Sequence, residues 1–244
     1  MLDYFGRYYS VTENRLTKRE SGCILEKTER GLLMEYTEEK KESAAQGLEE
    51  RKKTVYLIGD SITMGYRAVV KDVMRDVANV VYPAENGRSS QFVIVCLRGW
   101  SGLCDPESVG VVQFNTGHWD IAHWNDEEIS LTSVEEYGKN TVRIYDTLRR
   151  MYPNAVIVYA TTTRMNPNGS NSVNFRSTAE IEQYNAEAKR VLAGKDVVIN
   201  DLFAYTYDFP VQDYADYCHF KAATNERIGR RCAELYASLL EKKS

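Results

Sequence analysis

Two short segments, one near position 60 and one near position 218, carry the residue types of serine-based acyl chemistry. The first, Gly59-Asp60-Ser61-Ile62, places a hydroxyl directly after an apolar run. The second contains Asp216 and, three residues later, His219. A neutral imidazole can accept the proton of a serine, and a carboxylate on the other ring nitrogen fixes the tautomer and stabilises the imidazolium. The predicted nucleophile, base and orienting acid are therefore Ser61, His219 and Asp216.

The serine is expected at a turn between a strand and a helix. Residues 54–58 form an apolar run typical of a buried strand, and residues 63–79 have helical spacing of apolar side chains, namely Tyr66, Val70, Val73 and Val77. The free N–H groups and dipole of a helix N-terminus favour negative charge on a bound carbonyl oxygen. A simpler alternative is that Asp60 or Ser61 only caps this helix. In the same way, Asp216 could cap the last helix, with His219 merely nearby.

Gly-Asp-Ser-Ile after a first strand, with Asp-x-x-His before the last helix, resembles the SGNH or GDSL hydrolase superfamily. The similarity extends from about Thr54 to Leu240. Between these ends, residues 82–88 resemble the second block of the superfamily and residues 111–120 resemble its third block. The resemblance implies an oxyanion hole made by the Ser61 N–H, the Gly87 N–H and the Asn115 side chain. Such preorganised donors meet the negative charge that acyl transfer builds on the carbonyl oxygen.

The third block departs from the superfamily pattern. It usually reads Gly-x-Asn-Asp, whereas Gly117-His118-Trp119-Asp120 has tryptophan in place of the asparagine. Asn115 precedes Gly117 by two, which resembles a branch of the superfamily with Asn-x-Gly at this point, so we assign Asn115 as the side-chain donor. The alternative is a slipped alignment in which His118 or a backbone N–H does this work. For Gly87 the alternative is an ordinary turn glycine.

Strands and helices alternate from Thr54 onward. Further strands are expected at residues 80–82, 109–114, 155–160 and 197–199, and helices at residues 89–100, after Ser133, after Ser177 and at the C-terminus. Ser133 and Ser177 each precede a glutamate by three, which is a capping-box signature. This alternation predicts an α/β fold with a mostly parallel sheet covered on both faces. The resemblance specifies a three-layer α/β/α sandwich of flavodoxin-like type.

Substrate contacts are expected in the loops that follow the strands, because ligands of open α/β sheets bind beyond the strand C-termini. Each candidate also has a structural alternative, such as a core position, a surface ion pair or the end of a strand. The 17 tyrosines and three tryptophans would suit stacking on sugar rings. The candidates are Trp119, His118, Arg88, Thr162, Arg164 and Met165.

Length and composition predict one catalytic domain, and the extent of the resemblance places it at residues 54–244, preceded by an extension at residues 1–53. In the extension, residues 23–36 are expected to form a β-hairpin, and residues 37–53 a charged helix or linker. The net charge of -4 and the lack of a basic stripe argue against a nucleic-acid partner. Five cysteines without Cys-x-x-Cys spacing favour a reduced compartment. With no signal peptide or membrane span in the sequence as given, we expect a cytoplasmic protein without a membrane partner.

The leading hypothesis is a cofactor-independent serine esterase acting on small acyl esters, with an acetylated saccharide as the preferred substrate. The carbohydrate part of this hypothesis comes from the resemblance. One alternative is a thioesterase or lysophospholipase acting on longer acyl chains, and another is a non-catalytic carbohydrate-binding protein on the same fold. No metal is expected, because Asp216 and His219 have no further ligand set beside them in the sequence. The sequence makes no prediction about oligomeric state.

Overall fold

A five-stranded parallel sheet forms the centre of the computed structural model, which describes residues 52–169 and 174–242. The strands lie in the order β2-β1-β3-β4-β5. This is the flavodoxin-like order, in which the chain moves outward from β1 in both directions. The strands are β1 (Thr54–Ile58), β2 (Asn79–Val81), β3 (Val109–Phe114), β4 (Val156–Ala160) and β5 (Val198–Asn200).

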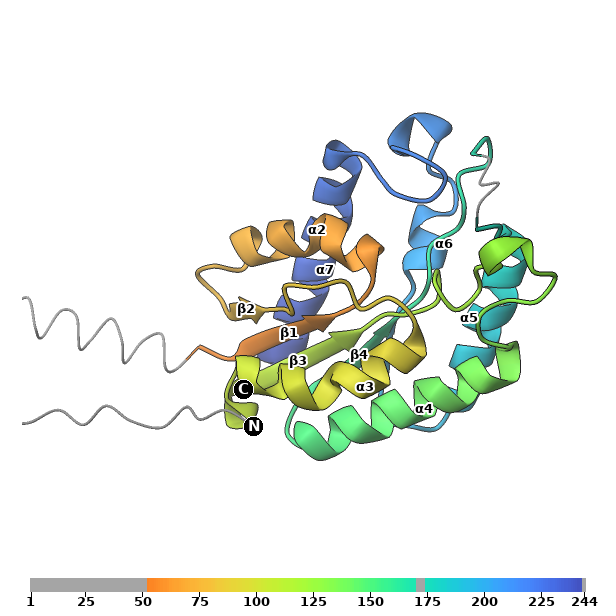
Figure 1. Cartoon of the computed structure of the whole chain (residues 1–244). Coiled ribbons are helices and arrows are strands. Elements are labelled where there is room, and N and C mark those ends of the chain that lie inside the picture. The colour runs from red at the N-terminus through yellow and green to blue at the C-terminus, as the bar shows by residue number, and fades with distance from the viewer. Residues whose placement is uncertain (1–51, 170–173, 243–244) are drawn as a thin grey trace, which may run out of the picture. The chain divides into compact units, whose positions relative to one another are not determined.

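Helices cover both faces of this sheet, as Figure 1 shows. On one face α2 (Ser61–Val73) packs against α7 (Ala222–Glu241), and on the other α4 (Val134–Met151) packs against α3 (Ser90–Trp100) and α5 (Thr178–Leu192). The expected α/β/α sandwich is therefore confirmed. The short helix α6 (Leu202–Thr206) follows β5, and single 3-10 turns lie at Ser101–Leu103, Pro106–Ser108, Trp124–Asp126 and Val211–Asp213.

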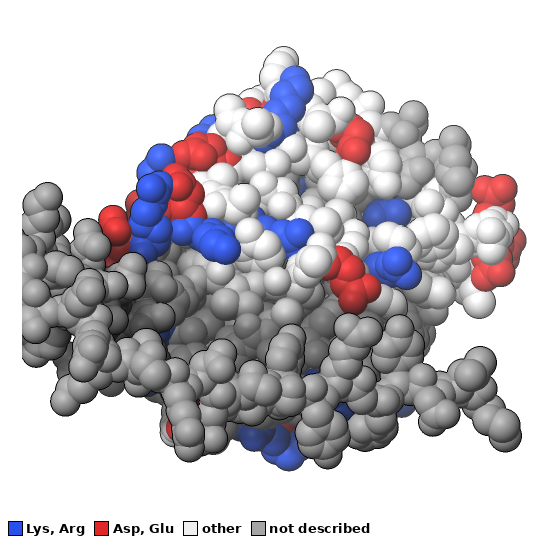
Figure 2. All heavy atoms as spheres, turned by 60° about the vertical axis from the view of Figure 1, so that its left-hand side comes forward, with Lys and Arg blue, Asp and Glu red and all other residues white. Residues whose placement is uncertain are grey.

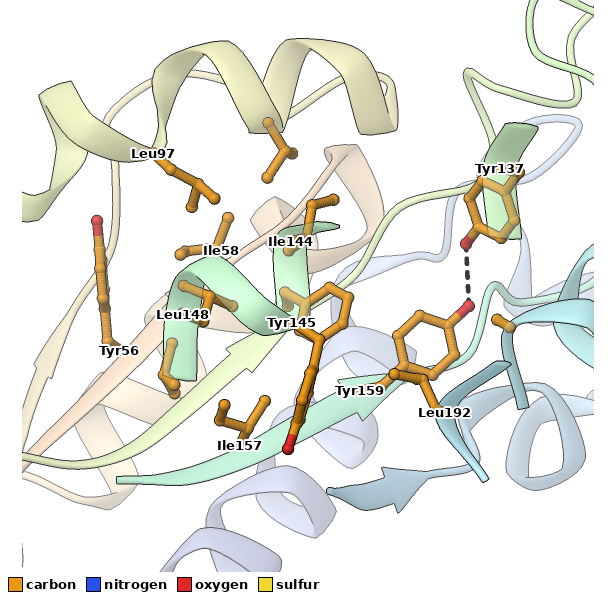
Figure 3. Packing of buried hydrophobic residues seen from close by; sticks show 14 of the residues in the cluster. Tyr56, Ile58, Leu97, Tyr137, Ile144, Tyr145, Leu148, Ile157, Tyr159 and Leu192 are labelled. Carbon is orange, nitrogen blue, oxygen red and sulfur yellow. Dashed lines mark hydrogen bonds between the residues drawn. The ribbon is translucent and has the colours of Figure 1, made fainter. Parts of the chain in front are cut away.

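The apolar core is divided by the sheet into two layers. Figure 3 shows the layer under α3, α4 and α5, where Ile58, Ile144 and Leu148 pack together without exposure to solvent. In the same layer, the buried hydroxyls of Tyr137 and Tyr159 are joined by a hydrogen bond of 2.9 Å. Pairing their polar groups lets these large aromatic side chains stay buried without a desolvation penalty. The core thus holds the carboxyl ends of β3 and β4 rigid.

One predicted helix is too long. The helix after β1 was expected to reach residue 79, but α2 ends at Val73, and Val73 and Val77 are exposed. The N–H of Met74 and the N–H of Ala78 bond to the Val70 and Met74 carbonyls, which close the last turn and lead the chain into β2. Apolar spacing alone does not locate the end of the helix, because Val73 and Val77 continue the helical spacing without being buried.

The expected hairpin at residues 23–36 and the linker at residues 37–53 lie almost wholly outside the described residues. The described residues belong to the second of two units, Leu48–Ser244, and the boundary at residue 54 stays a prediction. Within the described ranges, no helix has the length and apolar character needed to cross a membrane. On the face seen in Figure 2, acidic and basic side chains are mixed among uncharged ones.

Candidate active site

Ser61 is placed by the turn that joins β1 to α2. It is the first residue of α2, and Asp60 caps the helix by accepting a hydrogen bond from the Ile62 N–H at 3.0 Å. β1 is central, with β2 and β3 on its two sides, so Ser61 lies beside the point where the strand order reverses. Ligands of flavodoxin-like sheets bind in the crevice at this point. Asp60 is therefore the cap of α2, and Ser61 stays half-buried beside it.

His219 is held in a tight loop just before α7. The loop closes through an isolated antiparallel bridge between Tyr214 and Phe220, and the Ala215 N–H donates to the His219 carbonyl at 2.7 Å. A second loop, after β4, supports it, since the Asn166 N–H donates to the Tyr217 carbonyl at 2.7 Å. These bonds orient the imidazole back towards the end of β1.

The structure brings Ser61, His219 and Asp216 together in one chain of hydrogen bonds. His219 Nε2 lies 2.7 Å from Ser61 Oγ, and His219 Nδ1 lies 2.7 Å from Asp216 Oδ2. The serine and histidine are 158 positions apart in the sequence. In this geometry a neutral imidazole with its proton on Nδ1 donates to Asp216 and accepts the serine proton on Nε2.

Backbone hydrogen bonds keep the orienting acid ionised. Burial alone would raise the pKa of Asp216, but N–H donors of Cys218 and His219, together with the His219 side chain, hold the pKa below its usual value. The two N–H groups lie 2.9 Å and 2.8 Å from Asp216 Oδ1. A carboxylate that accepts such bonds stays charged, because they favour the charged form.

The cap residue Asp60 is a second acid close to the histidine. Burial raises the pKa of Asp60 to about 6, although the Ile62 N–H bond and the charge of His219 act to lower it. Its side chain is fully buried, and Oδ2 has no partner among the described residues. Asp60 therefore adds a titratable group directly behind the nucleophile that the sequence identified only as a cap.

Close approach of the backbone at Gly59 explains the glycine at position 87. The Gly87 N–H donates to the Gly59 carbonyl at 2.9 Å, and a side-chain carbon on Gly87 would lie 2.6 Å from that oxygen. The predicted second block is thus packed against the residue just before Asp60. In this structure the Gly87 N–H is engaged by Gly59, so its place in an oxyanion hole stays a prediction.

Asn115 directly follows β3, the strand next to β1. Its own N–H donates to the Ile58 carbonyl at 3.0 Å, and its Nδ2 donates to the Ala160 carbonyl at 3.1 Å. The side chain lies at the correct edge of the sheet, but it is buried, and its role as an oxyanion donor also stays a prediction. Two residues later Gly117 has φ of 142°, and a side-chain carbon there would lie 2.0 Å from Thr162 Oγ1. Only glycine fits this turn.

Two of the predicted substrate contacts are corrected by burial. Thr162 is inaccessible, and its hydroxyl donates to the Thr116 carbonyl at 2.7 Å. His118 is also buried, with Nε2 3.3 Å from Thr163 Oγ1. Burial, with the charges of Arg176 and His219, lowers the pKa of His118 well below its usual value, so the ring stays neutral. Neither side chain has surface left for a substrate.

Two other candidates, Arg88 and Trp119, meet at the end of the second and third blocks. The Arg88 guanidinium lies 5.9 Å from the centre of the Trp119 ring and 4.7 Å from that of Phe92. Trp124 extends the group, with its ring 5.0 Å from that of Trp119. Arg88 is exposed and Trp119 half-buried, so both can still meet a ligand. Their binding role stays a prediction.

The remaining candidates take part in the fold. Arg164 donates to the Phe209 carbonyl at 2.8 Å and lies 5.1 Å from the Tyr207 ring. Met165 is buried in the core cluster, which makes it a packing residue rather than a contact. The expectation for Met165 is therefore wrong, because β4 ends in a loop that turns inward.

Two buried charged residues near the site, Asp120 and Arg176, were not among the candidates selected from the sequence. Asp120 is fully buried and accepts hydrogen bonds from the Ser90 N–H and from Ser90 Oγ, the latter at 2.5 Å. This ties the third block to the start of α3. Arg176 lies just before α5, is 8% exposed, and acts electrostatically on Asp60 and His118. No periodic pattern marks Arg176, so only its position after folding reveals it.

Asp216, Cys218 and His219 form the one group of described residues whose ligand atoms are close enough to hold a metal. The chemistry of these three side chains is poorly suited to a metal ion. Burial raises the pKa of the Cys218 thiol, whereas metal binding needs the thiolate. The Nδ1 of His219 is already bonded to Asp216. These donors are committed to the hydrogen-bonded chain that ends at Ser61.

Comparison with solved structures identifies the fold. A lipase/acylhydrolase from Enterococcus faecalis is 18% identical with a TM-score of 0.59, covering 76% of this chain and 96% of that one. An acetyl xylan esterase is 15% identical with a TM-score of 0.59, covering 75% and 98%. A GDSL-like lipase from Bacteroides thetaiotaomicron is 15% identical with a TM-score of 0.61, covering 86% and 98%. No protein-family model and no curated protein sequence matches the chain.

The chain shares the fold of these lipase, acylhydrolase and esterase structures, one of which is described as GDSL-like, and this is the fold that the resemblance of the four blocks implied. Nearly the whole length of each of these neighbours is matched, so the likeness covers the complete sandwich rather than one βαβ unit.

Proposed function

We propose that this chain is a serine esterase that hydrolyses short-chain acyl esters, preferring O-acetyl groups on carbohydrate. The observation that carries the proposal is the hydrogen-bonded chain from Asp216 through His219 to Ser61, with both bonds at 2.7 Å. An acid, an imidazole and a hydroxyl in this order are the elements of nucleophilic acyl transfer. The fold supports the proposal, because it is shared with lipases and acylhydrolases.

In the proposed reaction Ser61 Oγ attacks the ester carbonyl carbon while His219 Nε2 takes the hydroxyl proton. The carbonyl oxygen becomes an oxyanion, which meets the N–H of Ser61 at the positive end of the α2 dipole. His219 then gives its proton to the departing alcohol, leaving an acyl-Ser61 ester. A water molecule, deprotonated by His219, attacks this ester; the bond to Ser61 Oγ breaks, His219 returns the proton to Oγ, and the carboxylic acid leaves. Asp216 stabilises the imidazolium in both halves of the cycle.

The preference for acetylated carbohydrate has weaker but specific support. The aromatic rings of Trp119 and Trp124 lie beside Arg88, the last residue of the second block. Aromatic faces with a polar edge suit sugar rings. One structural neighbour is described as an acetyl xylan esterase. These two observations favour a saccharide over a long acyl chain.

The test is hydrolysis of p-nitrophenyl acetate by the wild-type chain and by Ser61→Ala. Removing a catalytic nucleophile lowers kcat by at least about 10³-fold, so the variant should lose nearly all turnover. Ser238→Ala, which removes a hydroxyl from α7, is the matched control and should keep the wild-type rate. Equal rates for wild type and Ser61→Ala would remove Ser61 as nucleophile. An optimum at acyl chains of eight carbons or more would instead favour a thioesterase or lysophospholipase.

A fluorophosphonate probe separates catalysis from binding alone. Ser61 in an active triad should be labelled covalently, and labelling should disappear in Ser61→Ala. Saccharide binding without labelling and without ester turnover would show a carbohydrate-binding protein on the same fold.

A further inference from the structure

Arg176 is a buried cation without an ion-pair partner among the described residues. Its side chain is 8% exposed, and within the described ranges its guanidinium makes one hydrogen bond, from Nε to the Asn174 carbonyl at 3.4 Å. Arginine is almost never buried to this degree unless a carboxylate or phosphate is paired with it. No carboxylate of the described residues lies within ion-pair distance of Arg176, although its charge acts on the buried carboxyl of Asp60.

The position of Arg176 is set by the segments on either side of it. Phe175 forms an isolated antiparallel bridge with His123, and Ser177 caps α5. With both neighbours held by hydrogen bonds, the backbone of Arg176 is fixed at the start of α5. A cation on such a rigid support is preorganised for binding.

Arg176 lies next to the catalytic loop. Its guanidinium carbon is 5.4 Å from the centre of the Tyr217 ring, and the Tyr217 ring is 6.0 Å from that of His219. Its charge also reaches the groups behind the nucleophile, since it is one of the charges acting on Asp60, His118 and Cys218. Tyr217 therefore connects the Arg176 guanidinium to the loop that carries the catalytic histidine.

We propose that Arg176 binds a carboxylate on the alcohol part of the ester, so that the substrates are O-acetylated sugar acids. This inference rests on the esterase function proposed above. The planar fork of arginine matches a carboxylate in a bidentate pair, which lysine cannot reproduce. Tyr217, whose ring contacts both the Arg176 guanidinium and the His219 ring, is an aromatic neighbour for the ring that joins the carboxylate to the ester.

The experiment compares matched pairs of substrates that differ only in the anion. The first pair is 4-acetoxybenzoate and 4-acetoxybenzamide, and the second is an acetylated methyl glucuronoside and the corresponding methyl glucoside. The measured quantity is the ratio of kcat/KM for the acid to kcat/KM for its neutral partner. We expect the wild-type ratio to exceed one, and Arg176→Gln to lower it by about ten- to hundredfold, the range for hydrogen bonds to charged groups.

Two further variants isolate the geometry from the charge. Arg176→Lys keeps the charge but loses the fork, so its ratio should fall between those of wild type and Arg176→Gln. Arg98→Gln makes the same change of charge on the exposed end of α3 and should leave the wild-type ratio unchanged. An equal fall in Arg98→Gln would show a long-range charge effect and overturn the proposal.

The outcomes distinguish this inference from the proposed function. Turnover of both esters with a ratio near one, unaltered in Arg176→Gln, would overturn the carboxylate site and leave the esterase standing. No turnover of any ester and no fluorophosphonate labelling would overturn the esterase itself. Faster cleavage of 4-acetoxybenzenesulfonate than of 4-acetoxybenzoate would overturn the choice of carboxylate.

A measurement on the wild-type chain covers the case in which Arg176→Gln does not fold. Glucuronate and glucuronamide are compared as competitive inhibitors of p-nitrophenyl acetate hydrolysis. We expect glucuronate to bind at least about tenfold more tightly, because only it can form the bidentate pair. Equal inhibition by the two compounds would contradict the proposal.

Discussion

Ser61, His219 and Asp216 form a relay whose rigidity comes from backbone bonds more than from burial. The Asp216 side chain is 43% exposed and that of His219 34% exposed. In such a partly solvated site the two backbone N–H donors on Asp216 Oδ1 do the positioning. The Oδ2 atom is left free to orient His219. Each oxygen of this carboxylate thus has a separate task.

The variant Asp216→Asn should impair the orientation of His219 while it leaves the fold of the loop intact. The amide oxygen can still accept the N–H groups of Cys218 and His219, but the amide nitrogen would face Nδ1 and favour the wrong tautomer of the imidazole. We expect kcat to fall by about 10²–10⁴, with little change in stability. The rate is measured with p-nitrophenyl acetate and the stability by urea unfolding.

Asp213→Asn, in the same loop, is the control for this change. Asp213 pairs with Arg227 on α7 and does not touch His219. Its kcat should stay close to that of the wild-type chain. A full rate in Asp216→Asn would remove this carboxylate from the mechanism.

Among the elements, α5 has the more complete N-terminus of the two that carry the capping signature. Ser177 Oγ accepts from the Glu180 N–H at 3.2 Å, and Glu180 Oε2 accepts from the Ser177 N–H at 2.9 Å. Glu180 Oε1 also lies 2.7 Å from His123 Nε2. At α4, Ser133 Oγ accepts from the Glu136 N–H at 3.2 Å. The α5 cap therefore also fixes the chain that follows Arg176.

Ser177→Ala should destabilise the fold more than Ser133→Ala. Loss of a serine cap costs about 0.5–2 kcal/mol, and we expect Ser177→Ala near the upper end because it also frees Glu180 from one of its partners. The free energy of unfolding in urea measures both variants. An equal loss, or a larger one for Ser133→Ala, would show that the bond between Glu180 and His123 is independent of the cap.

Across the whole molecule, two fully buried carboxyls make stability depend on pH. Burial raises the pKa of Asp60 to about 6 and that of Asp120 to about 6, even though hydrogen bonds from Ile62 and from Ser90, respectively, act to lower them. Between pH 4 and pH 6 the folded state therefore binds more protons than the unfolded chain. The contribution of these two groups to the free energy of unfolding decreases as pH rises through this window.

Asp60→Asn should remove one of the two contributions. Asparagine is also a good N-cap, so α2 keeps its first hydrogen bond. We expect the stability of wild type relative to Asp60→Asn to fall by up to about 3 kcal/mol as pH rises from 4 to above 6, following the shift in pKa. Urea unfolding at a series of pH values measures it. Parallel curves for the two proteins would contradict a raised pKa at Asp60.

Most of the fold could be predicted from local pattern. The strand at residues 109–114 was placed at its observed bounds, and Ser177 starts its helix as its capping box indicates. These predictions succeed because alternation of apolar runs and caps depends on neighbouring residues. The end of α2 was missed, because the choice between a further helical turn and the entrance to β2 depends on the pairing of Asn79 with Thr54.

The candidate site likewise has one part that the sequence predicted and another that only folding determines. Residue type and the order of the four blocks along the chain selected Ser61, His219 and Asp216, although the sequence left helix capping as an alternative for Ser61 and Asp216. Folding alone determines which side chains face a ligand: it buries Thr162 and His118, engages the Gly87 N–H, and places Arg176 beside Tyr217. Burial and contacts between segments far apart in the sequence arise from packing on the sheet, and no local pattern encodes them.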